Sequence, residues 1–264
     1  MAFTGIDSYV AAAKQKVPWN KTASMTTVAN AWFSPFAQAG QPGAGTLAGS
    51  STTAGVVPDD TVAGYPSINA FGGGNTGYLT RVEYASTVAC RIAVFDRLFL
   101  AGAYAFNAAT TLSAQPSFLG REPNGNGLDC ELWLETVTAF TGNQSIAVTY
   151  TNQAGTAART TGTIATGVAP TVGRCLQLPL QAGDTGIQKV ESVTSTVSTV
   201  GTFNVMVLRP LWTARVTLAN MGDVHDIIRT GMPRIYDTSA LYVMIAADST
   251  ASGIPELSLQ VSNG

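Results

Sequence analysis

Charged side chains are scarce in this 264-residue chain. Lys and Arg number 14 and Asp and Glu 16, so that charged residues make up 11% of the sequence and the formal net charge is -2; about 25% charged residues is usual. This composition excludes disorder of the charged, apolar-poor kind, a basic nucleic-acid-binding face and a coiled coil. It also predicts an outer surface that is either rich in small uncharged residues or covered by neighbouring chains.

Long apolar runs are missing as well. The most apolar stretch, residues 88–106, contains Arg91, Asp96 and Arg97, and a membrane-spanning helix would not carry three charges. The N-terminal residues show neither the basic nor the apolar region of a secretory signal. We therefore expect no membrane span and no export signal, and no membrane or nucleic acid among the partners.

Cysteine is rare, and its three positions, Cys90, Cys130 and Cys175, each lie inside an apolar run. An odd number of cysteines in such positions does not indicate a disulfide framework. A cysteine nucleophile would need a His partner, and the chain has a single His, His225. We interpret all three cysteines as small buried core residues.

Sequence signatures of catalysis are also lacking, including the phosphate-binding, dinucleotide-binding, zinc-protease and nucleophile-elbow motifs. Asp129, Glu131 and Glu135 would share one face of a strand, with the first two about 7 Å apart, as in an inverting glycosidase. Two acids on one strand meet this spacing by chance very often. A solvated acidic strand face is therefore the preferred interpretation.

Two further acidic groups suggest metal ligands. Asp223 and His225, followed by Asp226, have ligand spacing if their segment is extended, and Asp59 with Asp60 offers carboxylates suited to Ca²⁺. An ordinary surface loop and a plain turn are the stronger interpretations. We therefore predict no catalytic residue, no metal site and no cofactor, and expect that the protein is not an enzyme.

What the sequence does contain is a series of short alternating segments separated by Gly, Pro and Asn turns. The pattern predicts strands over residues 79–84, 90–95, 98–100, 130–137, 145–150, 156–164, 175–180, 187–197, 203–208, 241–246 and 257–261. Thr is frequent throughout, and it favours strands while remaining polar. The fold class predicted is all-β, an antiparallel β-sandwich that is jelly-roll-like in its number of strands, over residues 78–264.

Residues 1–77 have a different character. Apolar residues at helical spacing, with Thr4 and Asp7 at the start and Pro18 at the end, predict a helix over residues 4–17. Residues 38–77 are rich in Gly, Ala, Ser, Thr and Pro and show no period. We interpret residues 1–77 as an N-terminal helix followed by an extended assembly arm, with a mobile linker as the alternative for residues 38–77.

Apolar side chains in this N-terminal region are candidates for anchors that insert into a neighbouring subunit. The candidate interface residues are Ile6, Tyr9, Val10, Trp19, Trp32 and Phe33. For the large aromatic residues among them, packing against the chain's own sandwich is an equally good interpretation. Trp133, beside Glu131 and Glu135, suits either a sugar-binding face or a subunit interface.

Several segments of the β region, spread in order over about half of the chain, resemble virion structural proteins of tailed bacteriophages. These segments are residues 94–98 (VFDRL), 131–135 (ELWLE), 147–152 (AVTYTN) with Gly155 and Arg159, 178–186 (LPLQAGDTG) and 207–211 (VLRPL). The resemblance implies a non-enzymatic virion part, a decoration or minor protein of the head. It supplies no catalytic residues.

The sequence thus predicts a phage head decoration (cement) or minor capsid protein that binds the major capsid protein, or other virion proteins, and stabilises the shell. We expect a homo-oligomer, with a trimer favoured, located on the capsid surface of the virion and assembled in the host cytoplasm. A neck or tail component of the virion is the structural alternative. A carbohydrate-binding or receptor-binding module, and a glycosidase acting through Glu131, are the alternatives from other classes.

Overall fold

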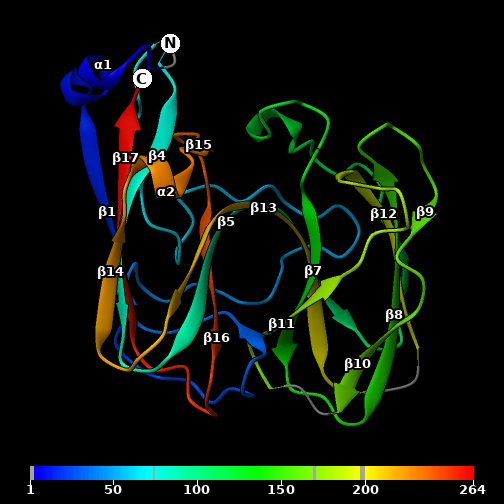
Figure 1. Cartoon of the computed structure of the whole chain (residues 1–264). Coiled ribbons are helices and arrows are strands. Elements are labelled where there is room, and N and C mark those ends of the chain that lie inside the picture. Colours follow the sequence, from blue (N-terminus) through cyan, green and yellow to red (C-terminus); the bar gives the residue numbers. More distant parts are fainter. Residues whose placement is uncertain (1–2, 74, 169–170, 197–199) are drawn as a thin grey trace.

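The computed structural model of this chain describes residues 3–73, 75–168, 171–196 and 200–264. Nearly all of its regular structure is β, and every strand pair formed by the described residues is antiparallel (Figure 1). The predicted all-β, sandwich-like fold class is confirmed. Three sheets make up the fold.

The first sheet forms one side of the molecule, at the left of Figure 1, with the strand order β14-β4-β17-β1-β3 and with β15 paired to β4. Its strands are β1 (Lys14–Lys21), β3 (Gly40–Gln41), β4 (Gly77–Ser86), β14 (Met221–His225), β15 (Arg234–Ile235) and β17 (Pro255–Asn263).

The second sheet forms the opposite side, with the order β10-β8-β12-β6 and with β9 paired to β8. Its strands are β6 (Ala109–Thr111), β8 (Asn143–Asn152), β9 (Arg159–Thr160), β10 (Ile164–Val168) and β12 (Ile187–Thr196).

A closed barrel of six strands, in the order β11-β2-β16-β5-β13-β7, lies between the two sheets. Its strands are β2 (Trp32–Phe33), β5 (Cys90–Ala105), β7 (Glu131–Thr138), β11 (Arg174–Leu178), β13 (Thr202–Val216) and β16 (Leu241–Ala247). Helical structure is confined to short turns. These are α1 (Ile6–Ala11), α2 (Ile227–Thr230) and the 3₁₀ turn η1 (Leu119–Arg121).

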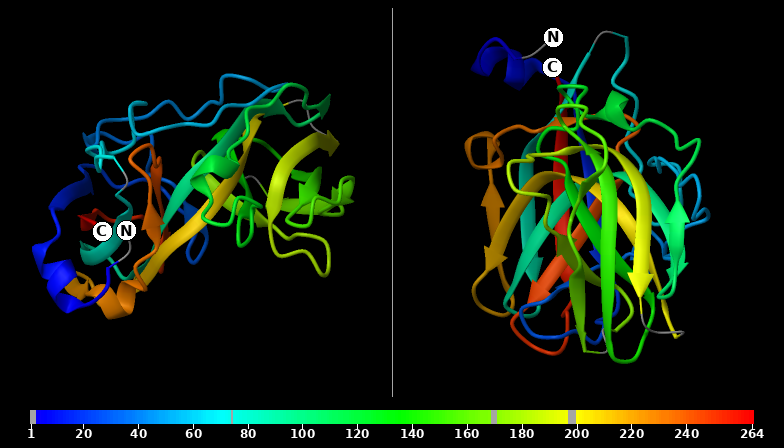
Figure 2. Two further views of the ribbon diagram at one scale, coloured as in Figure 1. Left: turned by 90° about the horizontal axis from the view of Figure 1, so that it is seen from above. Right: turned by 90° about the vertical axis from the view of Figure 1, so that its right-hand side faces the viewer.

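The long strands β5 and β13 tie the three layers together, as the two views of Figure 2 show. At one end of β5, Ile92 and Val94 pack in a core shared with the first sheet. Towards the other end, Ala101 and Tyr104 pack in a second core shared with the second sheet. Each of the two sheets thus packs against one side of the barrel, which is the layer common to both sandwiches. The apolar surface buried between these layers drives folding.

A third core lies on the inner side of the barrel. Side chains alternate between the two faces of a strand, so that Ala93 and Phe95 of β5 point away from the first sheet. They pack with Trp133, Met206 and Tyr242 from three other barrel strands. Residues Phe36, Leu47 and Tyr65, from the segment that follows β2, complete this core.

The predicted helix over residues 4–17 is wrong in its second half. The helix ends at Ala11, and β1 pairs with β17 from Lys14 to Asn20. Val17, Trp19 and Lys21 are buried and alternate with more exposed residues, which is the period of a strand. Residues 14–21 are therefore an integral part of the first sheet.

Other expected strands differ in their ends. The expected strands 90–95 and 98–100 are one strand, β5, and the strand expected to end at Leu208 continues through Pro210 to Val216. The single strand expected over residues 156–164 is replaced by the short strands β9 and β10. The strand expected over residues 187–197 is present to Thr196, and Val197 lies outside the described residues.

Candidate functional site

The helix α1 carries the most exposed of the candidate interface residues. Ile6 and Val10 are 64% and 68% exposed, and no residue of α1 is buried. Tyr9 connects the helix to the first sheet, because its hydroxyl accepts a hydrogen bond of 3.1 Å from Gln260 Nε2. Lys14 Nζ lies 4.7 Å from the centre of the Tyr9 ring, which adds a cation–π contact.

The large aromatic candidates lie elsewhere. Trp19 and Phe33 are 3% and 0% exposed. Trp19 packs in the core between the first sheet and the barrel. For these two residues the structure shows packing within the chain's own fold. Trp32 is half-buried, beneath the Arg91 guanidinium, whose carbon lies 5.3 Å from its ring centre. A role of the whole set in assembly stays a prediction.

The segment predicted as an extended arm, residues 38–77, packs on the chain's own fold: its ends belong to the first sheet, as β3 and the start of β4, and its middle lies along the barrel. Gly74 falls outside its described part. Val56 and Leu100 exchange two backbone hydrogen bonds of 2.8 and 2.9 Å, and Gly102 N donates to Ser51 O at 3.0 Å. Tyr104 of β5 adds a 2.7 Å hydrogen bond from its hydroxyl to Thr52 O. The middle of the segment is thus bound to β5.

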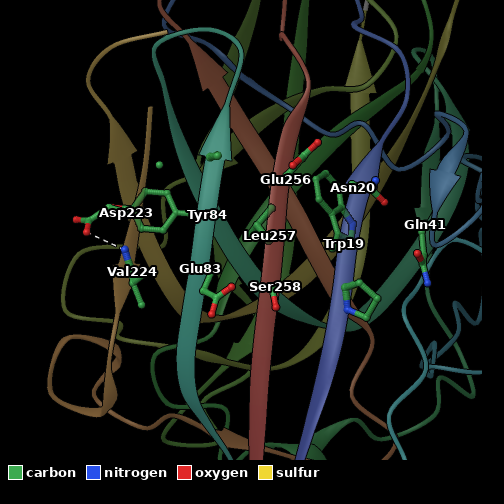
Figure 3. Close-up of a pocket in the computed structure, with 13 residues that line it drawn as sticks. Trp19, Asn20, Gln41, Glu83, Tyr84, Asp223, Val224, Glu256, Leu257 and Ser258 are labelled. Atoms are coloured by element: carbon green, nitrogen blue, oxygen red, sulfur yellow. Dashed lines mark hydrogen bonds between the residues drawn. The ribbon is translucent and has the colours of Figure 1, made fainter. Parts of the chain in front are cut away.

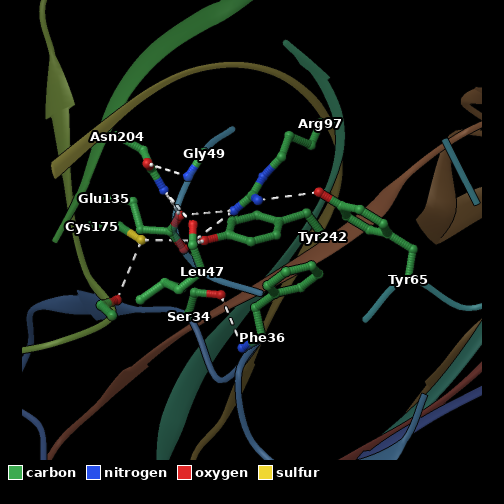
Figure 4. A network of polar contacts seen from close by, with 11 residues as sticks. Ser34, Phe36, Leu47, Gly49, Tyr65, Arg97, Glu135, Cys175, Asn204 and Tyr242 are labelled. Atoms are coloured by element: carbon green, nitrogen blue, oxygen red, sulfur yellow. Dashed lines mark hydrogen bonds and ion pairs between the residues drawn. The ribbon is translucent and has the colours of Figure 1, made fainter. Parts of the chain in front are cut away.

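A buried polar network holds this segment in place (Figure 4). Asn204, on β13, donates to Leu47 O at 2.6 Å and accepts from Gly49 N at 3.0 Å. Its amide also donates to Glu135 Oε2 at 2.9 Å. The Asn204 side chain therefore connects the segment to the charged centre of the barrel.

That centre is the ion pair of Arg97 and Glu135. Arg97 Nη2 lies 3.2 Å from both carboxylate oxygens of Glu135, and Arg97 Nη1 donates to the Tyr65 hydroxyl at 3.1 Å. The hydroxyl of Tyr242 also donates to Glu135. Burial raises the pKa of Tyr242 well above its usual value, which keeps this hydroxyl protonated and able to donate.

A second buried ion cluster binds the same segment further along. Asp96, with no exposed surface, lies between Arg121 Nη2 at 3.2 Å and Arg209 Nη2 at 3.3 Å. Arg121 also donates to the carbonyl oxygen of Pro58. Both clusters have the structural role of joining residues 47–65 to the barrel, and neither resembles a reactive centre.

The expected solvated acidic strand face is wrong for Glu135, which has no exposed surface, and the three acids have separate roles. Asp129 precedes β7 with a positive φ of 59°. Glu135 is the buried partner of Arg97, while Glu131 is half-buried and accepts a 2.7 Å hydrogen bond from Trp133 Nε1. Glu131 and Glu135 do share a face of β7 with Trp133, but the burial of Glu135 in an ion pair makes it unsuitable as a glycosidase carboxylate.

The residues considered as metal ligands, for which the sequence favoured a surface loop and a plain turn, are engaged within the chain. His225 accepts a 2.9 Å hydrogen bond from Trp212 Nε1, Asp223 forms an ion pair with Arg229, and Asp226 caps α2. Asp60 accepts from Ile68 N at 2.8 Å. In the described part of the chain no group of three or more His, Cys, Asp or Glu side chains is placed to hold a metal ion.

The cysteines lie where the sequence predicted. Cys90, Cys130 and Cys175 are free and buried. Burial raises the pKa of Cys130 to about 12, so that its thiol is unreactive at neutral pH. No helix among the described residues is long and apolar enough to cross a bilayer.

The outer face of the first sheet carries a groove of about 640 Å³ across β14, β4, β17 and β1 (Figure 3). In the sheet register, Asn20 lies opposite Glu256, which lies opposite Ala85, which lies opposite Gly222. The small residues at the end of this row hollow out the face. Glu83 of the same face is paired with Arg81 at 2.9 Å. The groove is open to solvent, and both apolar side chains and the carboxylates of Glu83, Asp223 and Glu256 line it.

A second cavity, here called the barrel pocket, has a volume of about 490 Å³ and opens to solvent. Residues from barrel strands and from α2 line it; they are Trp32, Ala93, Phe95, Glu131, Trp133, Gln177, Pro210, Leu211, Trp212, Thr213, Arg229 and Thr230. The sequence analysis singled out Trp32, Glu131 and Trp133, but it did not predict that Trp32 lies in the same cavity as the other two. The period of β7 places Glu131 beside Trp133, whereas the approach of Trp32, Phe95 and Trp212 depends on strand pairing that no local pattern encodes.

Comparisons of the sequence match no protein-family model and no curated protein. Among solved structures, matches are found to capsid structures of infectious bursal disease virus. T=1 particles derived from this virus align over 95% of this chain and 76% of that chain, at 10% identity and a TM-score of 0.19. Its VP2 subviral particle aligns over 96% and 80%, at 9% identity and a TM-score of 0.20. These neighbours are viral capsid proteins, but at such scores they carry no argument about this chain.

Proposed function

We propose that this protein is a structural component of a virion, of the head decoration (cement) or minor capsid type found in tailed bacteriophages, and that it has no enzymatic activity. Two independent considerations support the proposal. One is the resemblance of five segments of the β region, in the same order along the chain, to tailed-phage virion proteins. The other is the distribution of charge in the fold.

The observation that carries most weight is how little charge remains at the surface. Eight of the 30 charged side chains are buried, several of them in the ion clusters inside the barrel. The remaining ones are spread over a surface of 10,708 Å². A surface so weakly charged is poorly suited to an isolated soluble protein and well suited to contact with neighbouring subunits.

Within this proposal, α1 is the segment that contacts a neighbouring subunit. Residues 47–65 are bound to the chain's own barrel, and Trp19 and Phe33 are buried. Ile6 and Val10 are exposed on a helix with no buried residue of its own. Apolar side chains presented in this way gain free energy when a partner covers them.

Binding to undecorated phage heads tests the proposal. We expect the full chain to co-sediment with heads and the Ile6→Ser/Val10→Ser double variant to bind at least tenfold more weakly, since each buried aliphatic side chain contributes about 1.5–3 kcal/mol. Leu218→Ser is the matched control, because Leu218 is as exposed as Ile6, at 64%, but lies outside α1. Absence of co-sedimentation by the full chain would contradict a head protein.

The location of the copies on a particle separates the remaining possibilities. A decoration protein would be spread over the whole shell, and we expect a symmetric homo-oligomer, with a trimer favoured, measurable by light scattering. A single ring of copies at the portal or along the tail would instead identify a neck or tail component.

A further inference from the structure

Four aromatic rings contribute to the lining of the barrel pocket. Three of the four tryptophans of the chain contribute to it, together with Phe95. Phe95, Trp133 and Trp212 are buried, whereas Gln177, Pro210, Thr213 and Arg229 are exposed at its rim. A volume of about 490 Å³, lined by aromatic rings together with polar side chains, is within the size range of small-molecule sites.

Glu131 supplies the anionic group of the pocket. Its Oε2 accepts the 2.7 Å hydrogen bond from Trp133 Nε1. Over the described residues, no hydrogen bond or ion pair engages the other oxygen, Oε1. Because burial disfavours an unpaired carboxylate, a cation beside Oε1 would stabilise the charged form.

The Trp133 ring is held in place by contacts within the chain, before any ligand binds. The Trp133 indole is held by Glu131 through its nitrogen, and its ring meets that of Phe95 edge to face, with centroids 6.0 Å apart. The face of an indole attracts cations through its quadrupole. Arg91 already uses this property inside the chain, since its guanidinium carbon lies 5.3 Å from the centre of the Trp32 ring.

The other charges near the pocket are accounted for. Arg229, at the rim, is paired with Asp223 at 3.1 Å. Arg91, which stacks on Trp32, donates to the backbone oxygen of Asn30 at 3.2 Å. Glu131 is therefore the carboxylate that faces the cavity without a cationic partner, in the part of the chain that the structure describes.

We propose that the barrel pocket binds an organic cation, an ammonium or guanidinium group, held between the indole rings and the Glu131 carboxylate. The group is carried either by a small free molecule or by a Lys or Arg side chain of another polypeptide. This proposal is independent of the virion assignment, because it depends on the geometry of the pocket alone.

Tryptophan fluorescence and calorimetry measure the binding directly, since most of the indoles line the pocket. The first pair of probes is choline and its neutral isostere 3,3-dimethyl-1-butanol, which differ in charge and little in shape. We expect choline to bind at least about tenfold more tightly, which corresponds to the roughly 1–2 kcal/mol of a desolvated cation–π contact. Nα-acetyl-lysine methylamide and Nα-acetyl-arginine methylamide form the second arm, and tighter binding of these would indicate a protein side chain as the natural ligand.

The variant Glu131→Gln tests the carboxylate, because the amide oxygen still accepts the hydrogen bond from Trp133. We expect choline affinity to fall about tenfold, whereas Glu256→Gln, a change of an exposed carboxylate outside the pocket, leaves it unchanged. Unfolding curves of both variants check that the fold is retained. Equal binding of choline and its isostere, no saturable binding of any cation, or binding of neutral monosaccharides in their place would overturn the proposal.

Discussion

Arg97 and Glu135 form an ion pair at the centre of the barrel in which neither side chain has any exposed surface. Although burial by itself would lower the pKa of the Arg97 guanidinium, the neighbouring Tyr65, Glu135 and Tyr242 outweigh it and hold that pKa above its ordinary value. The Arg97 guanidinium therefore keeps its charge inside the barrel. Its contribution to stability depends on both partners being present.

Replacing one partner should be strongly destabilising. We expect Glu135→Gln to lower the free energy of unfolding by about 3–5 kcal/mol, because it leaves the Arg97 charge buried without a counterion. Urea unfolding monitored by fluorescence measures the change. Glu256→Gln, at an exposed position, is the control and should change stability by less than about 0.5 kcal/mol.

The double variant Arg97→Met/Glu135→Leu sharpens this test. It removes both charges and fills the space with apolar groups, so that its cost should be smaller than that of Glu135→Gln alone. A double variant that is less stable than the single variant would show that the ion pair itself, and not the unpaired charge, dominates the energetics of the barrel.

Asn204 controls a different property, the attachment of residues 47–49 to the barrel. Asn204→Ala removes the hydrogen bonds to Leu47 and Gly49 and leaves those backbone groups without their partner. We expect faster hydrogen exchange of residues 47–56, with a loss of overall stability of about 1–3 kcal/mol. Mass spectrometry of exchanged peptides measures the first effect.

Thr202→Ala is the matched control for Asn204. It lies on the same strand and removes an exposed side-chain hydrogen bond, to Thr138. Exchange of residues 47–56 should be unchanged in this variant. Unchanged exchange in Asn204→Ala as well would show that the backbone pairing of Val56 with Leu100 is sufficient to hold the segment.

The strands that could be predicted from the sequence are those with one buried face. In β8, Ile146, Val148 and Tyr150 are buried and alternate with more exposed residues, and this period can be recognised in the sequence. Strand β5 is buried on both faces over most of its length because cores lie on both sides of it, so its length could not be derived from alternation.

The N-terminal region shows why a short pattern misleads. Val17 continues the helical spacing of Tyr9 and Val10, but it also alternates with Trp19, and only the pairing of Lys14–Lys21 with β17 decides between the two. Pro18 ends a helix and is also accepted within β1, where it lies opposite Ser258. A choice made by tertiary contacts was not available from local periodicity.

For the candidate sites, the sequence could predict which residues of one strand lie side by side, but not which residues of different strands meet. The period of two correctly placed Glu131, Trp133 and Glu135 on one face of β7. Arg97, a residue type that is rarely buried, gave no local sign of its position beneath Tyr65 and Tyr242. Long-range strand pairing brings these groups together, and it is the part of the fold that single-sequence reasoning does not determine.

The hydrogen bonds of Asp184 to residues of the second sheet lead to a prediction of how stability depends on pH. Its carboxylate accepts hydrogen bonds from Arg159 Nε at 2.9 Å, from the Tyr150 hydroxyl at 2.7 Å and from Asn152 Nδ2 at 2.7 Å. The hydrogen bond from Arg159 is the main cause that lowers the pKa of Asp184 from 3.8 to about 2. In the unfolded chain the same group takes up its proton at higher pH.

The sign of the effect follows from this difference. Between pH 4 and 2 the unfolded state binds more protons at Asp184 than the folded state, so the stabilisation is present above about pH 4 and is lost as the pH falls through 2. We expect the wild-type chain to be more stable than Asp184→Asn at pH 6, with a difference that shrinks steadily towards pH 2. Arg159→Gln should show a weaker pH dependence of the same sign. Thermal unfolding at pH 6, 4, 3 and 2 measures all three proteins, and a constant difference across this range would show that the Asp184 charge does not contribute to stability.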